Sequence, residues 1–244
     1  MIYRLDETAP EQRFPDPELA EEEPNGLLAV GGDLHPRRLL NAYASGIFPW
    51  YSDGQPILWW SPDPRTVLYP SEVHVARSLR RQLRRGGLEL RIDSDFAGVI
   101  RACAEPRRDE PGTWLVPEMQ QAYLRLHQLG HAHSFELWQD DRLVGGLYGV
   151  SLGRAFFGES MFSRVPSASR IVMVYLCERL QVHGYPLIDC QVFNPHLARM
   201  GAREIPRSRF LAELGAALRL PPVPEVWQAP PLACDRLQHA GAGG

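Results

Sequence analysis

The feature that most constrains the fold is a succession of three strand-like segments in the middle of the chain. Each segment carries aromatic residues, which favour strands. The connections between the segments are only a few residues long, as in antiparallel hairpins. The sequence therefore predicts an antiparallel meander, with strands at residues 133–138, 143–150 and 154–162 and turns at 139–141 and 151–153.

Helical patterns flank this meander on both sides. Ser167 is placed to cap the helix that follows it, and Gly46 is suited to end a helix that begins at Pro36. One strand after the meander is expected to pair alongside it, which indicates an α+β protein. The remaining predicted elements are strands at 88–92 and 187–190 and helices at 95–104, 117–129, 168–182 and 206–218.

Composition removes several classes of function. All 26 basic residues are arginine, so the chain lacks the lysine of a Walker A loop and the Schiff-base lysine of pyridoxal enzymes. The cysteines are scattered and His131 and His133 have no third ligand nearby, so we expect neither a disulfide framework nor a metal site. No apolar run approaches the ~20 residues that span a membrane, and we expect a cytoplasmic protein.

The stretch from 156 to 163 places a carboxylate on an otherwise apolar strand. Alternation along a strand predicts that Glu159 shares its face with Phe157 and Met161. Burying a charge without a partner is costly, so an inward-facing Glu159 requires a cation, a donor or a cavity. The pattern is equally consistent with an edge-strand glutamate that points to water.

The last predicted strand ends in a second polar group. Alternation puts Asp189 and Gln191 on the same side, so we expect a carboxylate and an amide to reach one group together. With Glu159 on another strand, this arrangement is typical of a small active site. Asp189 is also consistent with a cap for the turn at 194–197, and His196 with either a base or a partner for loop backbone.

A helix predicted at 73–85 is unusually basic. Its apolar stripe consists of Ala76, Leu79 and Leu83. Phosphates are the natural partners of such a helix, and a solvated surface beside acidic neighbours is the alternative. The aromatic segment at 50–60 is consistent with a core plug between two lobes or with a wall on which bases stack. The net charge of −3 argues against a wholly basic nucleic-acid binder but allows a local patch made of Arg77, Arg80, Arg81, Arg84 and Arg85.

The order of meander, helix and further strand resembles the acyltransferase fold of the GNAT superfamily. Its coenzyme-A-binding members hold pyrophosphate on a glycine-rich turn before the helix. Residues 163–169 form that connection here and contain no glycine, which disfavours coenzyme A, although Arg164 and the helix start could hold another anion. We expect a small N-terminal α/β lobe at 1–64 and a GNAT-like domain at 65–244, whose mostly antiparallel sheet is flanked by helices.

Several longer motifs are more specific. They include Trp59-Trp60-Ser61-Pro62-Asp63-Pro64-Arg65 and the segments 24–34, 46–50, 112–114, 129–134, 143–150, 158–163 and 188–191. On these motifs the chain resembles the leucyl/phenylalanyl-tRNA–protein transferase family from about residue 14 to about residue 210. The resemblance implies transfer of Leu, Phe or, less well, Met from aminoacyl-tRNA to proteins with an N-terminal Arg or Lys, which marks those proteins for N-end rule degradation. No cofactor is implied, because the ester is already activated.

The resemblance also implies roles for individual residues. Asp189 would act with Gln191 on the attacking amine, either as a true base or as an electrostatic anchor, and Glu159 would help hold the aminoacyl end. The helix at 73–85 would meet phosphates of the acceptor stem. Tyr43, Trp50 and Trp114 would flank the terminal adenosine and the aminoacyl group, and the apolar pocket would be formed by Leu147, Phe156, Met161 and Ser163.

The chain departs from the family pattern in two places. Leu147 stands where methionine is expected, which gives a stiffer pocket wall. Arg199-Met200-Gly201-Ala202 replaces a Ser-Leu-Gly-Ala run, so no role carries over to position 199. We expect a monomer. A non-catalytic tRNA-binding module and a coenzyme-A-dependent N-acyltransferase are the alternative functions.

Overall fold

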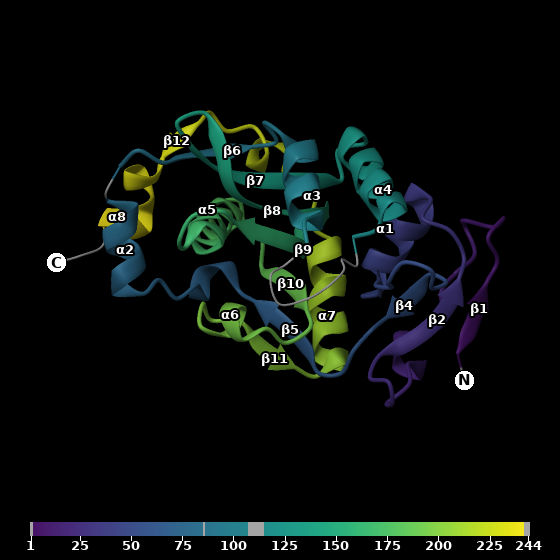
Figure 1. The fold of residues 1–244 in the computed structure, drawn as a ribbon. Coiled ribbons are helices and arrows are strands. Elements are labelled where there is room, and N and C mark those ends of the chain that lie inside the picture. Colours follow the sequence, from purple (N-terminus) through teal and green to yellow (C-terminus); the bar gives the residue numbers. More distant parts are fainter. Residues whose placement is uncertain (1, 85, 107–114, 242–244) are drawn as a thin grey trace.

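The computed structural model describes residues 2–84, 86–106 and 115–241, which form two sheets with surrounding helices (Figure 1). The smaller sheet belongs to residues 3–60 and has the strand order β1-β2-β4-β3. Its first two strands are parallel and the other neighbours are antiparallel. The bounds are β1 Tyr3–Leu5, β2 Leu27–Gly31, β3 Phe48–Pro49 and β4 Leu58–Trp60, with helix α1 Pro36–Ala44 between β2 and β3.

Helix α1 begins and ends as the sequence predicts. Pro36 occupies the first turn, and the side chain of His35 accepts a hydrogen bond from the backbone N–H of Arg37 at 3.2 Å. The helix stops before Gly46, whose φ of +72° is a left-handed conformation that glycine adopts without steric cost. A side chain at this position would also collide with Leu211, because an added Cβ would lie 2.6 Å from its Cδ2 atom.

The larger sheet contains the predicted meander. Its order is β11-β5-β10-β9-β8-β7-β6-β12, and the antiparallel pairing of β7 with β8 and of β8 with β9 confirms the meander. Strand β10 pairs beside β9 in parallel, as expected of the further strand. The bounds are β5 Arg65–Leu68, β6 Glu89–Ile92, β7 Ala132–Gln139, β8 Arg142–Leu152, β9 Ala155–Ser163, β10 Leu187–Gln191, β11 Arg203–Ile205 and β12 Leu232–Ala233.

Helices cover both faces of the larger sheet, and the sheet separates two hydrophobic cores. Adjacent residues of β9 show the division, because Phe156 packs in one core and Phe157 in the other. The Phe156 core includes residues of α2 and α5, and the Phe157 core includes residues of α1, α3, α4 and α7. The bounds are α2 Arg77–Leu83, α3 Phe96–Ala104, α4 Pro117–Gln128, α5 Ala168–Val182, α6 Pro195–Ala198, α7 Arg207–Leu218 and α8 Gln238–Gly241.

Two local predictions are wrong. The basic helix predicted at 73–85 begins only at Arg77, because Val73 and Ala76 have ψ values of 125° and 148°, outside the helical range. The backbone N–H of His74, between them, donates to the carbonyl oxygen of Met200 at 2.8 Å. Ser167 precedes α5 but makes no capping hydrogen bond, since it lies in the left-handed region at φ +64° and its Oγ accepts from Arg170.

The small sheet and the large sheet share a core. Trp59 of β4, Tyr43 of α1 and Phe157 of β9 belong to one cluster of buried side chains. The division after residue 64 stays a prediction. Over the ranges that the structure describes, no helix is both long enough and apolar enough to cross a membrane.

Candidate active site

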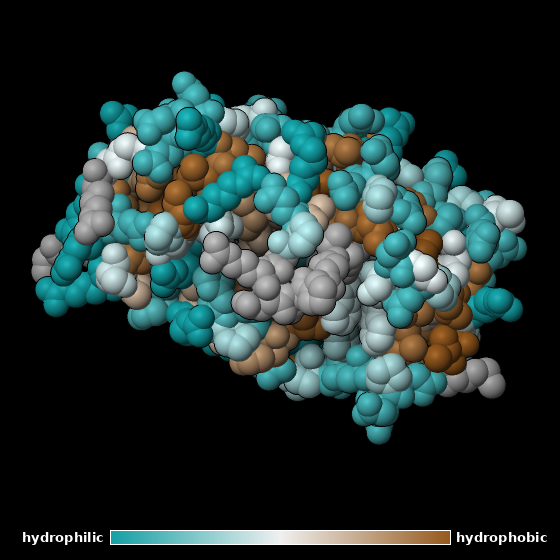
Figure 2. Space-filling view, in the orientation of Figure 1, coloured by the Kyte–Doolittle hydropathy of each residue, from teal (hydrophilic) through white to brown (hydrophobic). Residues whose placement is uncertain are grey.

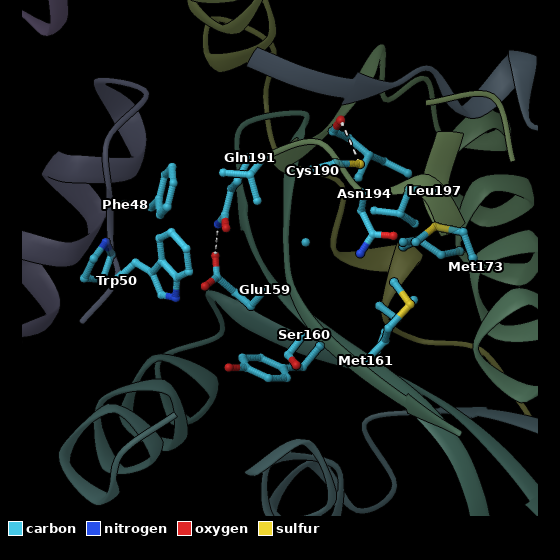
Figure 3. A pocket seen from close by; sticks show the side chains of 17 residues that line it. Phe48, Trp50, Glu159, Ser160, Met161, Met173, Cys190, Gln191, Asn194 and Leu197 are labelled. Atoms are coloured by element: carbon cyan, nitrogen blue, oxygen red, sulfur yellow. Dashed lines mark hydrogen bonds between the residues drawn. The ribbon is translucent and has the colours of Figure 1, made fainter. Parts of the chain in front are cut away.

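A cavity opens where β9 and β10 separate. The two strands pair in parallel only as far as Phe157 and Asp189. Beyond this pair lies a cavity of about 290 Å³, bordered by residues 158–161 of β9 and by residues 190–192 at the end of β10 (Figure 3). The separation of two neighbouring strands thus creates a site in the middle of the sheet.

Strand β9 bulges at Glu159. The β8 partners of Gly158 and Ser160 are consecutive residues, so Glu159 between them has no partner of its own. Glycine on the opposite strand makes room for the bulge, because a Cβ at Gly149 would lie 2.2 Å from the carbonyl oxygen of Phe157. The bulge turns the extra residue toward the cavity.

This bulge overturns the predicted alternation of β9. Phe157 packs in the core beneath α1 and α4, whereas Met161 packs against the core beneath α5. The two residues therefore do not share a face, because one inserted residue reverses the side to which every later side chain points. The prediction that Glu159 shares a face with both is wrong for this reason.

Strand β10 has a matching irregularity at its end. Its register against β5 shifts between Asp189 and Gln191, and Gln191 has a φ of +65°. Such a conformation is uncommon for a residue with a side chain and is typical of functional positions. It turns the Gln191 amide toward β9 and leaves the Asp189 carboxylate facing β5. The two groups do not reach one partner together, contrary to the alternation prediction.

Glu159 is held by hydrogen bonds rather than by a cation. Its Oε1 accepts from Nε2 of Gln191 at 2.8 Å (Figure 3). Its Oε2 accepts from the hydroxyl of Tyr123 at 2.6 Å. The hydroxyl groups of Tyr123 and Tyr43 lie 2.7 Å apart. Within residues 2–84, 86–106 and 115–241, no ion pair includes Glu159.

Burial raises the pKa of Glu159 to about 7, and the negative charge of Asp189 acts in the same direction. The hydrogen bonds from Tyr123 and Gln191 act in the opposite direction. Burial also raises the pKa of Tyr43 and of Tyr123 well above the usual range, so both hydroxyl groups stay protonated. Part of the Glu159 surface remains open, because it borders the cavity.

Asp189 is bound by a buried arginine. Arg65 donates from Nε and Nη2 to the two carboxylate oxygens, at 2.8 and 2.7 Å, and both side chains are essentially inaccessible. The Arg65 guanidinium lies 4.8 Å from the ring centre of Phe48 and 4.6 Å from that of Phe210. Oδ1 of Asp189 also accepts from the backbone N–H of Gln191 at 2.9 Å. This contact supports the unusual backbone conformation of Gln191.

Sequence reasoning assigned no site role to Arg65 or Tyr123. Arg65 lies in one of the quoted motifs, but the sequence around it does not indicate that it pairs with Asp189, which is distant in sequence. Tyr123 is one of the buried residues of α4, and a tyrosine at such a position usually packs in the hydrophobic core. The capping alternative for Asp189 is wrong, because Asn194 caps α6 by accepting from the backbone N–H of His196 at 2.8 Å.

The cavity has one aromatic side and one aliphatic side. Phe48 and Trp50 lie on one side of the hydrogen-bonded Glu159 and Gln191, and Met161, Met173 and Leu197 lie on the other (Figure 3). Trp50 is 45% exposed, as expected of a ring at an open site. The other apolar lining residues are Pro49, Leu147, Leu176, Ile188 and Val192.

The structure brings some of the predicted substrate-binding residues to the cavity and not others. Trp50, Leu147 and Met161 line it. Tyr43 lies behind Glu159, linked through Tyr123. Two others lie elsewhere, because Phe156 is fully buried in the core and Ser163 accepts from the backbone N–H of Ser169. Trp114 lies outside the described residues.

The predicted tRNA-binding arginines lie on or next to α2. Arg77, Arg81 and Arg84 are exposed, and the edge of the molecule around α2 is mostly hydrophilic (Figure 2). Arg80 is partly buried and donates from Nε to the carbonyl oxygen of Val75 at 3.2 Å. Arg85 lies outside the described residues.

One side-chain cluster away from the cavity contains possible metal ligands. His127 and Asp93 approach His133, whereas the sequence indicated His133 only as a pair with His131. Nδ1 of His133 lies 2.7 Å from Asp93 Oδ2, and Nδ1 of His127 lies 2.8 Å from the carbonyl oxygen of Ala132. A carbonyl oxygen only accepts, so Nδ1 of His127 carries a hydrogen and is not available as a ligand. The absence of a metal site stays a prediction.

Comparisons with known proteins agree on the family. The family model of leucyl/phenylalanyl-tRNA protein transferase matches residues 67–215, and that of its N-terminal domain matches residues 32–63. Leucyl/phenylalanyl-tRNA–protein transferase of Alkalilimnicola ehrlichii is 59% identical over 221 residues, which are 90% of this chain and 86% of the relative. The enzyme of the same name from Nitrosospira multiformis is 60% identical over 201 residues, 82% of this chain and 87% of the relative.

A solved structure, that of L-PGS from Bacillus licheniformis, is 12% identical with a TM-score of 0.38 and covers 55% of this chain and 49% of its own, too weak a likeness to decide anything. The close relatives define an enzyme that transfers aminoacyl groups from tRNA. The chain belongs to the leucyl/phenylalanyl-tRNA–protein transferase family.

Proposed function

We propose that the cavity between β9 and β10 is the site at which the leucyl or phenylalanyl group passes from tRNA to an acceptor protein. The proposed acceptor is an N-terminal α-amino group of Arg or Lys, Met is a poorer donor residue, and the product is marked for N-end rule degradation. The observation that carries the proposal is the hydrogen bond between Glu159 and Gln191, which faces a cavity with one aliphatic wall.

The aliphatic wall suits the donor side chain. Leu147, Met161 and Met173 offer apolar surface that accommodates unbranched or γ-branched side chains. Valine and isoleucine, which branch at Cβ, would collide near the mouth. One methylene is worth only ~1–3 kcal/mol of discrimination, so selectivity among Leu, Phe and Met is expected to be incomplete. Trp50 on the opposite side is suited to stack on the terminal adenosine.

The hydrogen bond to Glu159 also sets the orientation of the Gln191 amide. Its Nε2 donates to the carboxylate, so its carbonyl oxygen is the end left to accept a hydrogen bond. An amine N–H is a suitable donor, and we assign the attacking α-amine to this oxygen. The Glu159 carboxylate, which lacks a cation of its own, is suited to hold the α-ammonium of the aminoacyl group.

The reaction itself needs no activating nucleotide. The acceptor α-ammonium, whose pKa in an unstructured peptide is about 8, first loses a proton. The amine then attacks the ester carbonyl, the new bond joins nitrogen to that carbon, and the ester C–O bond breaks. The ribose oxygen leaves and takes up a proton. Fixed donors at the site stabilise the oxyanion that forms between these steps.

Asp189 is assigned a positioning role rather than the role of a base. Its bidentate pair with Arg65 and its burial keep it away from the cavity, which supports the electrostatic-anchor alternative. Through its contact with the backbone N–H of Gln191 it fixes the residue that touches the amine. A base in direct contact with substrate would need an open carboxylate oxygen.

The remaining features of the proposal concern the donor and the fold. The exposed arginines of α2 are assigned to phosphates of the acceptor stem, with Arg80 and Arg85 as the other members of the set. The pairing of β9 with β10 and their separation at the cavity support a GNAT-like arrangement for residues 65–244. We propose that the enzyme acts as a monomer.

A transfer reaction tests the proposal directly. Purified protein is mixed with labelled Leu-tRNA, without ATP or coenzyme A, and with peptides that differ only in an N-terminal Arg, Lys or Met. Label on the Arg and Lys peptides alone is the expected result, and an N-acetylated Arg peptide controls for reaction at side chains. Label on all peptides would refute the acceptor rule. No label, with tRNA still bound, would favour a binding module without catalysis.

A further inference from the structure

Three potentially cationic side chains gather beside the cavity, apart from the arginines of α2. Arg170 lies in the first turn of α5, His196 lies on α6, and Arg199 follows α6 directly. Nε2 of His196 is 3.4 Å from the hydroxyl of Ser169, which connects the two helices. Burial lowers the pKa of His196, and the positive charges of Arg170 and Arg199 lower it further. We call these three residues the α5–α6 cluster.

The arginines of the α5–α6 cluster have no carboxylate to neutralise them. Across residues 2–84, 86–106 and 115–241, no ion pair includes Arg170 or Arg199. Arg164, a few residues earlier, differs because it pairs with Glu105. Like charges close together repel one another, so an unneutralised cluster on a surface favours the binding of an anion, and guanidinium groups match phosphate well.

The cluster lies between α2 and the cavity. Gln82 of α2 donates from Nε2 to the carbonyl oxygen of Pro166 at 2.6 Å, which brings α2 next to the start of α5. On the other side, Asn194 and Leu197 of the α6 segment line the cavity (Figure 3). A nucleic acid that contacts α2 and places its end in the cavity therefore passes the cluster.

We propose that Arg170 and Arg199 bind backbone phosphates of the single-stranded 3′ end of the aminoacyl-tRNA as it enters the cavity. The inference rests on the proposed function, because it takes tRNA to be the donor at this cavity. The cavity of about 290 Å³ admits an aminoacyl group and not a duplex, so the chain that leads into it is a single strand. Arg199 is one of the positions at which this chain departs from the family pattern, and its contact adds to those of α2.

The test compares a donor that carries phosphates with one that does not. The double variant Arg170→Gln with Arg199→Gln is assayed with phenylalanyl-tRNA and with phenylalanyl-adenosine, which has no phosphate. We expect kcat/KM to fall roughly tenfold or more with phenylalanyl-tRNA, as charge-assisted hydrogen bonds are lost, and to change less than about twofold with phenylalanyl-adenosine. The slope of log kcat/KM against log salt should flatten by about 0.7 for each lost phosphate contact.

Arg219→Gln is the matched control. Arg219 is exposed at the end of α7, beside the β8–β9 turn at Gly153, and α5 begins after the opposite end of β9. This variant should retain the wild-type salt slope. An equal loss with both donors would overturn the proposal, because the arginines would then act on the pocket. An unchanged value with phenylalanyl-tRNA would overturn it too.

The outcome stays separable from the proposed function. If the wild-type protein transferred nothing, the proposed function would fail, and binding of fluorescent tRNA to the same variants would still test the cluster. Weaker binding with a flatter salt slope in the double variant alone supports the phosphate contacts. Equal binding by wild type and double variant rejects them.

Discussion

The two central strands each hold one carboxylate at the site, and the surroundings of the two differ. Asp189 on β10 faces Arg65, with two hydrogen bonds and complete burial. Glu159 on β9 faces the cavity and receives hydrogen bonds from a tyrosine and a glutamine, without a cation. Arg65 thus neutralises the charge of Asp189, whereas the charge of Glu159 is available to pair with a cationic group of a substrate.

This difference indicates a supporting role for Asp189 and a chemical role for Glu159, on two neighbouring strands. A bidentate arginine pair fixes the geometry of a carboxylate and supplies its counter-charge. Burial without a neighbouring cation raises the pKa of Glu159 to about 7, which lies in the range where a group can exchange protons or charge with a substrate. Gln191 joins the two regions, with its backbone on Asp189 and its side chain on Glu159.

The largest effect on stability and transfer is expected when the pair of Asp189 and Arg65 is broken. Asp189→Ala leaves the Arg65 guanidinium buried without a counter-charge, which should lower the free energy of unfolding by about 3–5 kcal/mol. Transfer should be lost, because the conformation of Gln191 loses its anchor, while tRNA binding stays within a few-fold. Urea unfolding and tRNA titration measure the two quantities.

A double variant tests whether the pair supports structure alone. Arg65→Met with Asp189→Val removes both charges and fills the space with apolar groups, so it should recover part of the stability that Asp189→Ala loses. It should not recover transfer, since the Gln191 backbone still lacks its acceptor. Recovery of transfer together with stability would show that Asp189 has no part in positioning Gln191.

The second largest effect is expected on transfer when Glu159, which borders the cavity, loses its charge. Glu159→Gln keeps the shape of the side chain and removes its charge, so the fold should persist while transfer falls roughly 10²–10³-fold, as when a fixed electrostatic partner is lost from an active site. Transfer kinetics measure this loss, and Glu204→Gln, on exposed β11, is the matched control. Wild-type activity in Glu159→Gln would remove the charge of Glu159 from the mechanism.

Much of the fold could be predicted from local pattern. The meander and the helix at 168–182 depend on alternation, helical periodicity and turn residues, and these signals are short-range. The basic helix was predicted too long, because residues 73–76 are not helical and His74 there donates to Met200, which is far away in sequence. A pattern of residues does not contain such a contact.

The site was predicted in its residues but not in its geometry. Glu159 and Gln191 were recognised as polar groups on strands, yet both sit at register shifts, and a strand's regular alternation fails at a bulge. The signal that could have found the first bulge is the glycine-rich opposite strand, where Gly149 leaves room for it. Arg65 and Tyr123 were missed because each meets its partner only through the tertiary fold.

The third effect is a shift in pH dependence. Glu159 is an acid whose folded pKa of about 7 lies above its unfolded value of 4.5. Its contribution to stability is therefore complete below about pH 4.5 and is lost as the pH rises through 7, an upper bound on the order of 3 kcal/mol before screening by water in the cavity. The stability of wild type relative to Glu159→Gln should decline across that window in urea unfolding at several pH values.

Activity should change with pH in the opposite direction, because transfer requires the ionised carboxylate. Tyr123→Phe removes a hydrogen bond that lowers the pKa of Glu159. The inflection of kcat/KM near pH 7 should therefore move upward by roughly one unit. Tyr185→Phe removes a hydroxyl from a core tyrosine away from the cavity and controls for the loss of a hydrogen bond. An inflection that does not move would assign the titration to the acceptor amine.

The smallest effect is expected on the apolar wall of the cavity. Leu147→Met replaces a branched side chain with a more flexible one of similar volume, so stability should change by less than about 1.5 kcal/mol. A more adaptable wall should narrow the differences in kcat/KM among Leu-, Phe- and Met-tRNA by less than about tenfold, since a pocket gains or loses only ~1–3 kcal/mol per methylene. The matched control is Leu90→Met, a buried core leucine of β6 that does not line the cavity. If both variants altered the preference equally, the effect would come from general loosening of the core and not from the wall at Leu147.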